Sequence, residues 1–281
     1  MRFKITSSNA LFFLAVSALL WSMGGVFFRS TPLPALAIAG GRSFFAALTL
    51  AILFKHIPRP SWQMLPAALS FLCVGVSLII CTKETSAATA IFLQYTAPLY
   101  IPLLGYFILR TPVKAADWIA LICIIFGMGL LCFDHLQLGS WMGLSLGLCS
   151  GIAFALFIVL AKKLPLNERM SAVFWGNVLT AFLSVPFFIG QHLTVSTGLL
   201  LGVAGIIQLG LPYWIYVKAI GFVSPLNAVF IPTLEPLFNP VWVFFILGEP
   251  VSTLSILGGL FVLITVSVHS YVGLKSSLRA S

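Results

Sequence analysis

The chain has 281 residues, enough for one or two soluble domains, but its composition excludes a soluble fold. Hydrophobic residues make up 60% of it and Asp, Glu, Lys and Arg only 7%, against about 25% charged residues in a typical soluble protein. The net charge of +9 is scattered one or two residues at a time between apolar runs, without the basic stripe or motif that a nucleic-acid-binding protein carries.

Apolar runs recur along the whole chain, each about 20 residues long and therefore able to cross a bilayer core as a helix. The first follows Arg2 and Lys4, as in a signal peptide, but it is long for a cleaved segment and further spans follow, so we expect it to be retained. The connectors are too short to hold a soluble domain. The predicted fold is thus an all-α integral membrane protein of ten transmembrane helices, at 9–28, 34–54, 63–82, 86–109, 115–133, 140–161, 170–190, 197–217, 223–247 and 252–273.

The positive charges orient these spans, because Lys and Arg gather on the cytoplasmic side of membrane proteins. With a cytoplasmic N-terminus, the opposite side receives only Arg29 and Lys83, while Arg42 falls inside a span. The pattern predicts a multi-pass protein of a bacterial-type inner (plasma) membrane with both termini in the cytoplasm. The residues on the cytoplasmic side are Arg2, Lys4, Lys55, Arg59, Arg110, Lys114, Lys162, Lys163, Arg169, Lys218, Lys275 and Arg279.

An internal repeat is found when residues 86–113 are laid on 224–251 without a gap. Eleven positions coincide, and three of them are prolines with matching neighbours, which shared apolar bias does not explain. The repeat predicts two five-helix units, 1–138 and 139–281. Because five is odd, the second unit enters the membrane in the opposite direction, and such inverted repeats are the architecture of many secondary transporters. A duplication that merely builds a larger scaffold is the alternative.

No pattern in the sequence indicates a catalytic site, a metal or a cofactor. The five cysteines lie within or at the ends of apolar segments without CxxC or Cys/His spacing, so they are expected to pack as small apolar residues. The four histidines form no HExxH motif and no cluster with acidic residues. A membrane-embedded enzyme and a non-transporting membrane scaffold are therefore the less favoured alternatives.

Arg42 and Glu235 are the main candidates for a solute pathway, because a charge inside a span is costly and normally faces a cavity or a partner. Arg42 could attract an anionic group of a solute, or it could lock helices by bonding to backbone carbonyls. Glu235 could hold an amine, carry a coupling proton, or pair with Arg42. Prolines near Glu235 and in the matching span remove helix hydrogen bonds, which membrane helices tolerate where the freed carbonyls line a cavity or are buried in protein. These helix-breaking prolines are Pro98, Pro102, Pro232, Pro236 and Pro240.

The span at 86–109 carries a polar face that we expect to line the same cavity. Thr89, Thr96 and Tyr100 fall on one side of a continuous helix, whereas Gln94 points away from them, toward a neighbouring helix. Because this span and the one at 223–247 are repeat partners, their polar faces are expected to oppose each other. Interhelical hydrogen bonding is the alternative explanation for the threonines.

Further candidates are weaker. Asn227 and Asn239 form a broad polar stripe with Glu235, and Asn177 approximately matches Arg42 in the repeat. Aromatic residues could stack on a planar solute or bind a cation, although lipid-facing and interfacial positions are common for them. The GxxxG series on the span at 140–161 indicates close helix packing. The remaining candidates are Trp21, Gln208, Tyr213 and Trp214.

The segments Ala90-Ile-Phe-Leu-Gln-Tyr-Thr-Ala-Pro98, Leu234-Glu-Pro-Leu-Phe-Asn-Pro240 and Leu247-Gly-Glu-Pro250 resemble the EamA-type signatures of the drug/metabolite transporter superfamily. The resemblance extends over the whole chain. In the first half, Arg110-Thr111-Pro112 stands where the family often has Gly-Glu-Pro, which puts in doubt any role that needs this glutamate in both halves.

This resemblance implies a secondary transporter that moves a small metabolite, such as an amino acid or a related compound, by alternating access, and many relatives are exporters. Its partners would be the solute and the lipid bilayer, and the chain would be a monomer or a homodimer. Uptake or exchange of a nucleoside-containing metabolite such as S-adenosylmethionine is the alternative. Proton coupling is a further hypothesis, and no other cofactor is expected.

Overall fold

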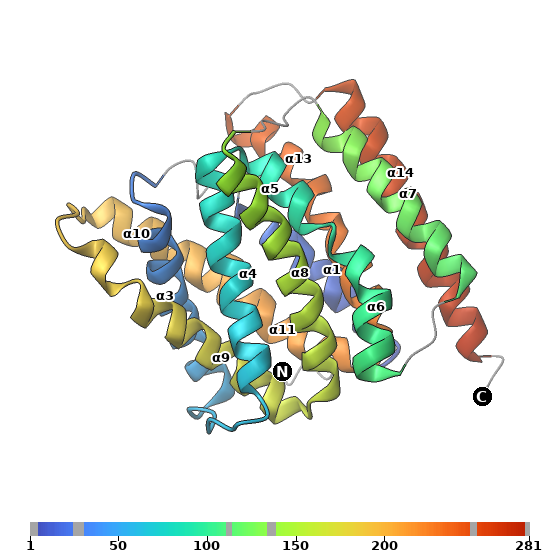
Figure 1. Ribbon diagram of the computed structural model, residues 1–281, viewed down its shortest axis with the longest axis horizontal. Coiled ribbons are helices and arrows are strands. Elements are labelled where there is room, and N and C mark those ends of the chain that lie inside the picture. The colour runs from blue at the N-terminus through green and yellow to red at the C-terminus, as the bar shows by residue number, and fades with distance from the viewer. Residues whose placement is uncertain (1–4, 25–30, 111–113, 134–138, 248–251, 279–281) are drawn as a thin grey trace.

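The computed structural model is helical and free of strands over the residues that it describes, and its helices lie side by side in one bundle (Figure 1). The structure describes residues 5–24, 31–110, 114–133, 139–247 and 252–278. Within the last two ranges it leaves out the side chains of residues 239, 240, 243, 244, 246, 247 and 273–278.

Seven stretches of the described chain are long and apolar enough to cross a membrane, so the chain is an integral membrane protein. They coincide, within a few residues, with seven of the ten predicted spans. They are α3 (Ala35–Phe54), α4 (Leu65–Glu84), α5 (Ala87–Gln94) with α6 (Ala97–Leu109), α7 (Ala115–Cys132), α8 (Trp141–Lys163), α10 (Val195–Val203) with η3 (Ala204–Gly210) and α11 (Leu211–Ala219), and α14 (Thr253–Leu278).

The three other predicted spans are helical in their described parts but are not among these seven stretches. They correspond to α1 (Ala10–Trp21), α9 (Leu166–Leu183) and a broken helix made of α12 (Pro225–Phe230), η5 (Ile231–Leu234) and α13 (Glu235–Leu247). The count of ten spans, like their grouping into two inverted units, therefore stays a prediction.

The start predicted for α9, at residue 170, is wrong by four residues. The helix already begins at Leu166, directly after Pro165, so Arg169 lies in a helix and not in a connector. Proline is well tolerated at a helix start, and the acidic Glu168 in the first turn suits the positive end of the helix dipole. These two local signals explain the earlier start.

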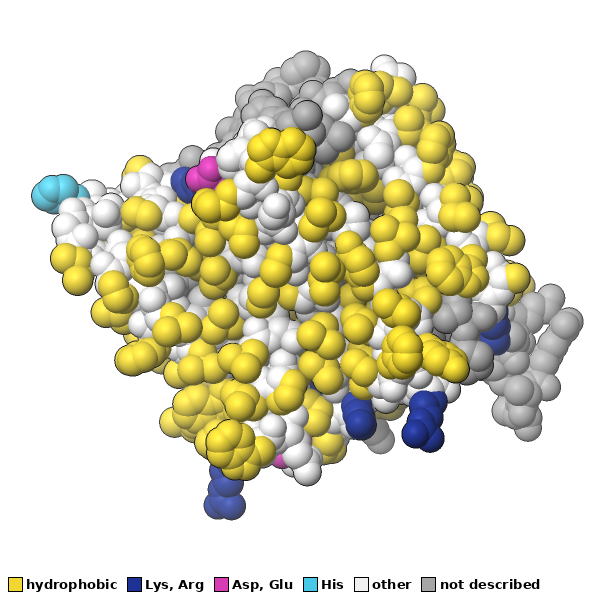
Figure 2. Space-filling view, viewed as in Figure 1, with side chains coloured by type: hydrophobic (Ala, Val, Ile, Leu, Met, Phe, Trp, Pro, Cys, Tyr) yellow, Lys and Arg dark blue, Asp and Glu magenta, His cyan; other side chains and the backbone are white. Residues whose placement is uncertain are grey.

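The outer surface is apolar over a broad band. In Figure 2, hydrophobic side chains cover the middle of the face, while Lys and Arg side chains gather mainly toward its lower margin. Large side chains on several helices are largely exposed, among them Ile52, Phe107 and Ile119. Soluble monomers rarely expose apolar patches of such extent, whereas lipid tails cover them at no cost. The surface therefore fits a bilayer.

Helix α8 packs closely against α4, α5 and α6 (Figure 1). Its glycines allow this approach: a Cβ atom on Gly147 would lie 2.5 Å from Leu93 Cδ1, and one on Gly151 would lie 2.8 Å from the Leu93 carbonyl oxygen. These distances are shorter than real Cβ contacts, so a larger residue at either position would force its neighbours to shift. The interpretation of the GxxxG series as close helix packing is confirmed. At one edge of the bundle, α7 and α14 pack side by side.

Candidate functional site: a buried polar cavity

Two broken helices, α5–α6 and α12–η5–α13, begin and break at matching positions. Their first turns are capped by Ser86 and Ser224, which are paired in the gap-free alignment of the sequence. Each serine Oγ accepts a hydrogen bond of 3.1 Å from a backbone N–H three residues later. The second parts begin at Ala97 and Glu235, which are also paired in the alignment. Serine caps followed by Pro98 and Pro236 account for this shared geometry.

The break in α12–η5–α13 follows from its prolines. Pro232 and Pro236 have no N–H, so the carbonyls of Ala228 and Pro232, four residues earlier, lose their helical donors. Two tyrosines from other parts of the chain replace them. The hydroxyl of Tyr216 donates to Ala228 O at 2.8 Å, and the hydroxyl of Tyr95 lies 2.7 Å from Pro232 O. The backbone N–H of Glu235 also donates to Pro232 O, in the 3-10 pattern of η5. The freed carbonyls are thus satisfied inside the protein and need no water.

Beside this break lies a cavity with about 560 Å³ of empty space, part of it open to the outside. Six of the candidate residues from the sequence line it: Trp21, Arg42, Gln94, Gln208, Tyr213 and Glu235. The lining also includes residues that the sequence analysis did not single out: Ser43, Phe71, Val74, Gly75, Leu78, Tyr95, Phe154, Thr180 and Leu209.

Arg42 projects from α3 and is only 4% exposed. Its Nη1 donates a hydrogen bond of 3.0 Å to Gln208 Oε1, and Gln208 Nε2 donates in turn to the carbonyl of Trp21 at 3.3 Å. Gln208 lies in η3, a π-helical segment that precedes Pro212. Because Pro212 cannot bond to the carbonyl of Gln208, the regular ladder is interrupted there, and π-helical turns of this kind are frequent at functional sites.

Glu235 lies at the start of α13, and its Oε2 is 2.8 Å from the hydroxyl oxygen of Tyr95. It is close enough to Arg42 and Tyr213 to interact electrostatically with both. Tyr213 packs between two further rings of the cavity wall, with ring centroids 4.8 Å from Trp21 and 4.7 Å from Phe71. The cavity therefore combines one cation, one carboxyl and an aromatic wall.

The polar face predicted for span 86–109 is wrong in its details. Thr89 bonds to Ser86 within its own helix, the hydroxyl of Thr96 donates to the carbonyl of Leu93, and neither lines the cavity. Tyr100 lies on α6, also away from the lining. The prediction assumed a continuous helix, whereas the chain breaks between Gln94 and Ala97 and thereby turns a different face inward.

Gln94 and Tyr95, at the end of α5, are the residues that this break presents to the cavity. Gln94 also reaches a neighbouring helix, as predicted, because its Nε2 donates to Ser150 Oγ on α8 at 3.2 Å. Tyr95 was missed. The signal that could have found it is Pro98. Because Pro98 has no N–H for the carbonyl of Gln94, the preceding helix ends there and Tyr95 lies at the break.

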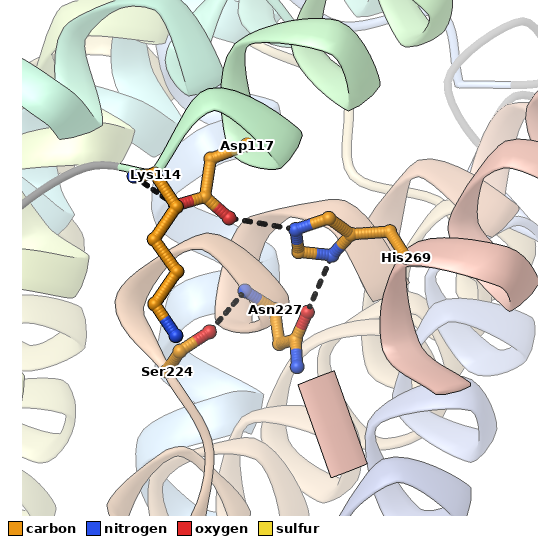
Figure 3. A network of polar contacts seen from close by, with 5 residues as sticks. All are labelled: Lys114, Asp117, Ser224, Asn227 and His269. Carbon is orange, nitrogen blue, oxygen red and sulfur yellow. Dashed lines mark hydrogen bonds and ion pairs between the residues drawn. The ribbon is translucent and has the colours of Figure 1, made fainter. Parts of the chain in front are cut away.

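Asn227 was predicted to share the polar stripe of Glu235. It is instead part of a separate polar network that joins α12 to α14 and α7 (Figure 3). Its Oδ1 lies 3.1 Å from His269 Nδ1, and His269 Nε2 lies 2.8 Å from Asp117 Oδ1. Asp117 Oδ2 accepts a hydrogen bond from the backbone N–H of Lys114 at the start of α7. The network ties α12 to the α7–α14 pair and does not line the cavity.

The remaining candidates also lie elsewhere. The side-chain nitrogen of Asn177 donates to Val173 O within α9, and Trp214 packs under Lys218, whose Nζ is 3.6 Å from the ring centroid. The side chains of Asn239 and Pro240 lie outside the described residues. Among the residues that the structure describes, no group of His, Cys, Asp or Glu is arranged to hold a metal ion.

Comparisons with known proteins agree with this arrangement. The model of the EamA-like transporter family matches residues 8–133 and 141–271. A protein of Archaeoglobus fulgidus described as an uncharacterized transporter is 25% identical over 252 residues, which cover 89% of this chain and 92% of the relative. A crystal structure, described only as that of a protein, superposes with a TM-score of 0.80 at 14% identity over 95% of this chain and 99% of the other, which shows a shared fold.

An apolar outer band around a bundle with a buried polar cavity defines a multi-pass membrane protein with a polar interior. The family match covers most of the sequence, so the chain belongs to the EamA-like transporter family and is a membrane transporter. The resemblance found in the sequence to EamA-type members of the drug/metabolite transporter superfamily is confirmed. The comparisons point to transport and not to an enzymatic activity.

Proposed function

We propose that this protein is a secondary transporter that exports an amino acid or a related small metabolite by alternating access. The observation that carries the proposal is the presence of Arg42 and Glu235 in one buried cavity, contributed by two different helices. A zwitterionic solute offers a carboxylate for the guanidinium of Arg42 and an amine for the carboxyl of Glu235. Bidentate geometry makes arginine well suited to carboxylates.

The broken helices support alternating access. In secondary transporters, binding sites lie near the midplane, beside interrupted helices and at the boundary between repeated units. Here the cavity lies beside the break at Glu235, and two separate parts of the chain match the family model. We propose that these two parts move relative to each other around the cavity. In this arrangement both termini are in the cytoplasm and the protein resides in a bacterial-type inner membrane.

The aromatic wall suggests which solutes to test. Tyr213, Trp21 and Phe71 present flat apolar surfaces next to the charged pair. Amino acids with small and with aromatic side chains form the first panel. Nucleoside-containing metabolites such as S-adenosylmethionine form the second, because their planar bases also stack on aromatic rings and they carry a zwitterionic end.

The test uses the purified protein in lipid vesicles. Vesicles with and without the protein are loaded with the two panels, and the solutes that leave are identified by mass spectrometry. For a solute that is transported, Arg42→Gln and Glu235→Gln should each lower the flux by about 10- to 100-fold, the loss expected when one charge-assisted hydrogen bond is removed. Arg59→Gln, which removes an exposed arginine, is the control and should transport normally.

Wild-type flux from both cavity variants would contradict the role of the charged pair. Proton coupling is part of the same proposal, with Glu235 as the proton carrier. An imposed pH gradient should then change the flux of the wild-type protein, and flux that ignores the gradient would reject this part alone.

A further inference from the structure

Tyr95 differs from Tyr216 in one respect. Both hydroxyls satisfy a carbonyl that a proline has freed in α12–η5–α13, but only Tyr95 also contacts a carboxyl group. Its hydroxyl oxygen lies 2.7 Å from Pro232 O and 2.8 Å from Glu235 Oε2. Both distances are those of full O–H···O hydrogen bonds.

A phenol carries one hydrogen, so Tyr95 can donate fully to only one of these two oxygens. If Glu235 is ionised, its carboxylate and the Pro232 carbonyl are both acceptors, and one short contact contains no hydrogen. If Glu235 is protonated, both contacts are satisfied: Tyr95 donates to Pro232, and the carboxyl group donates to the oxygen of Tyr95. A proton on Glu235 is therefore what would give both short contacts a hydrogen.

We propose that Tyr95 is a positioning residue that couples the proton on Glu235 to the bend of α12–η5–α13, an inference that rests on the proposed transport function. When the carboxyl group gives its proton to a water molecule in the open part of the cavity, a carboxylate and a hydronium ion form. The hydrogen of Tyr95 then turns to the carboxylate, because charge-assisted hydrogen bonds are about twice as strong as neutral ones. The carbonyl of Pro232 then loses one of its two donors and keeps only the backbone N–H of Glu235, so the helix loosens at η5.

The groups around Glu235 are compatible with such a switch. Among the residues that the structure describes, Arg42 on α3 is the charged side chain that acts on it. Tyr213 on α11 and Tyr95 are the titratable groups that act on it electrostatically. The gain or loss of one proton on Glu235 therefore changes the charge opposite Arg42.

Infrared difference spectroscopy of the protein in lipid nanodiscs tests the protonation state directly. The wild-type protein should show a carboxylic-acid band that disappears as the pH rises and is absent from Glu235→Gln. In Tyr95→Phe the frequency of this band should change, because its hydrogen bond to the phenol is lost. In Tyr216→Phe the frequency should stay the same. No Glu235 band at any pH at which the protein is folded, or an unchanged band in Tyr95→Phe, would overturn the proposal.

Hydrogen exchange of the backbone of residues 225–247 tests the coupling. In the wild-type protein, protection around η5 should fall by about five- to tenfold at the pH at which the Glu235 band disappears, as expected for one lost hydrogen bond. Tyr216→Phe should start from lower protection but keep this step. Tyr95→Phe should have low protection throughout and no step, and a step of wild-type size in this variant would overturn the proposal.

Glu235→Gln provides a second variant in case Tyr95→Phe folds poorly. The glutamine amide can donate to Tyr95 at every pH, so protection should stay high and show no step. A pH step that persists in Glu235→Gln contradicts the proposal. Because these measurements need no solute, they separate a failure of the coupling from a failure of the transport function: vesicles that transport normally without a band or step would reject only the coupling.

Discussion

Arg42 Nη1 and Gln208 Oε1 lie 3.0 Å apart, and this hydrogen bond joins the cation of α3 to the π-helical segment η3. The orientation of the Gln208 amide is fixed, because its Nε2 donates a hydrogen bond to the carbonyl of Trp21. A neutral amide holds the guanidinium in place without cancelling its charge. Arg42 can therefore be held in one position and still keep its positive charge. Recognition of an anionic group requires both.

Replacing Gln208 by leucine should destabilise the protein more than the same change at Gln94. Both glutamines are buried at the cavity, but Gln208 bonds to a charged group and Gln94 to the hydroxyl of Ser150. Hydrogen bonds to charged groups contribute about 1.5–3 kcal/mol, and neutral ones about 0.5–1.5 kcal/mol. Thermal unfolding in detergent should therefore show a larger fall in apparent melting temperature for Gln208→Leu. Equal falls would mean that the charge adds nothing.

Much of the fold could be predicted from the sequence, because the signals are strong and local. Runs of apolar residues gave seven of the spans within a few residues, and the GxxxG series predicted the close approach of α8 to its neighbours. Charge at membrane depth is so costly that Arg42 and Glu235 could be singled out before their surroundings were known. The cavity does contain both residues.

The rest depends on geometry that a helical wheel does not contain. A wheel assumes one continuous helix, so the break after Gln94 misplaced Thr89, Thr96 and Tyr100 and concealed Tyr95. The partner of Asn227 is His269, 42 residues later in the sequence, and local periodicity cannot indicate such a pairing. Prolines marked where helices break, but not which tyrosines would satisfy the freed carbonyls.

Gly205→Ala should be poorly tolerated, whereas Gly202→Ala should not. A Cβ atom on Gly205 would lie 2.4 Å from the carbonyl oxygen of Arg42 and 2.5 Å from Phe45 Cβ, so α3 and η3 would have to separate. On Gly202, one turn earlier, the nearest atom would be at 3.8 Å, an ordinary contact. Overpacking costs about 1–3 kcal/mol. Melting temperatures and flux of the two variants would check this, and a normal Gly205→Ala protein would show that the helices can move apart freely.

The contact between His269 and Asp117 should be measurable as a coupling energy between α14 and α7 (Figure 3). Asp117→Ala should cost more than His269→Ala, because Asp117 also accepts the backbone N–H of Lys114. The double variant should cost less than the sum of the two by about 0.5–3 kcal/mol, as for residues in direct contact. Pairing Asp117→Ala with Thr265→Ala, a change elsewhere on α14, should be additive. Additivity for His269 as well would mean that the contact does not stabilise the helix pair.

Two neighbouring lysines at the end of α8 should differ sharply in their effect on stability. Lys162 Nζ donates to the carbonyl of Ile220 at 2.7 Å and also to that of Val223, at the end of the segment that contains α11. Lys163 is exposed.

Helix ends leave carbonyls without donors, and a cation that binds them adds a favourable interaction with the helix dipole. Lys162→Met should therefore lower the free energy of unfolding by about 1.5–3 kcal/mol, the usual contribution of a charged hydrogen bond. Lys163→Met makes the same change in charge and length and should leave stability nearly unchanged. A shared loss in both variants would assign the effect to net charge and not to the carbonyls.

Arg169, whose Nη1 donates to Val217 O at 3.1 Å, binds the same helix end. A double variant of Lys162 and Arg169 should accordingly expose the 217–223 segment to hydrogen exchange before the rest of the bundle, because both cations are lost from the carbonyls that close it.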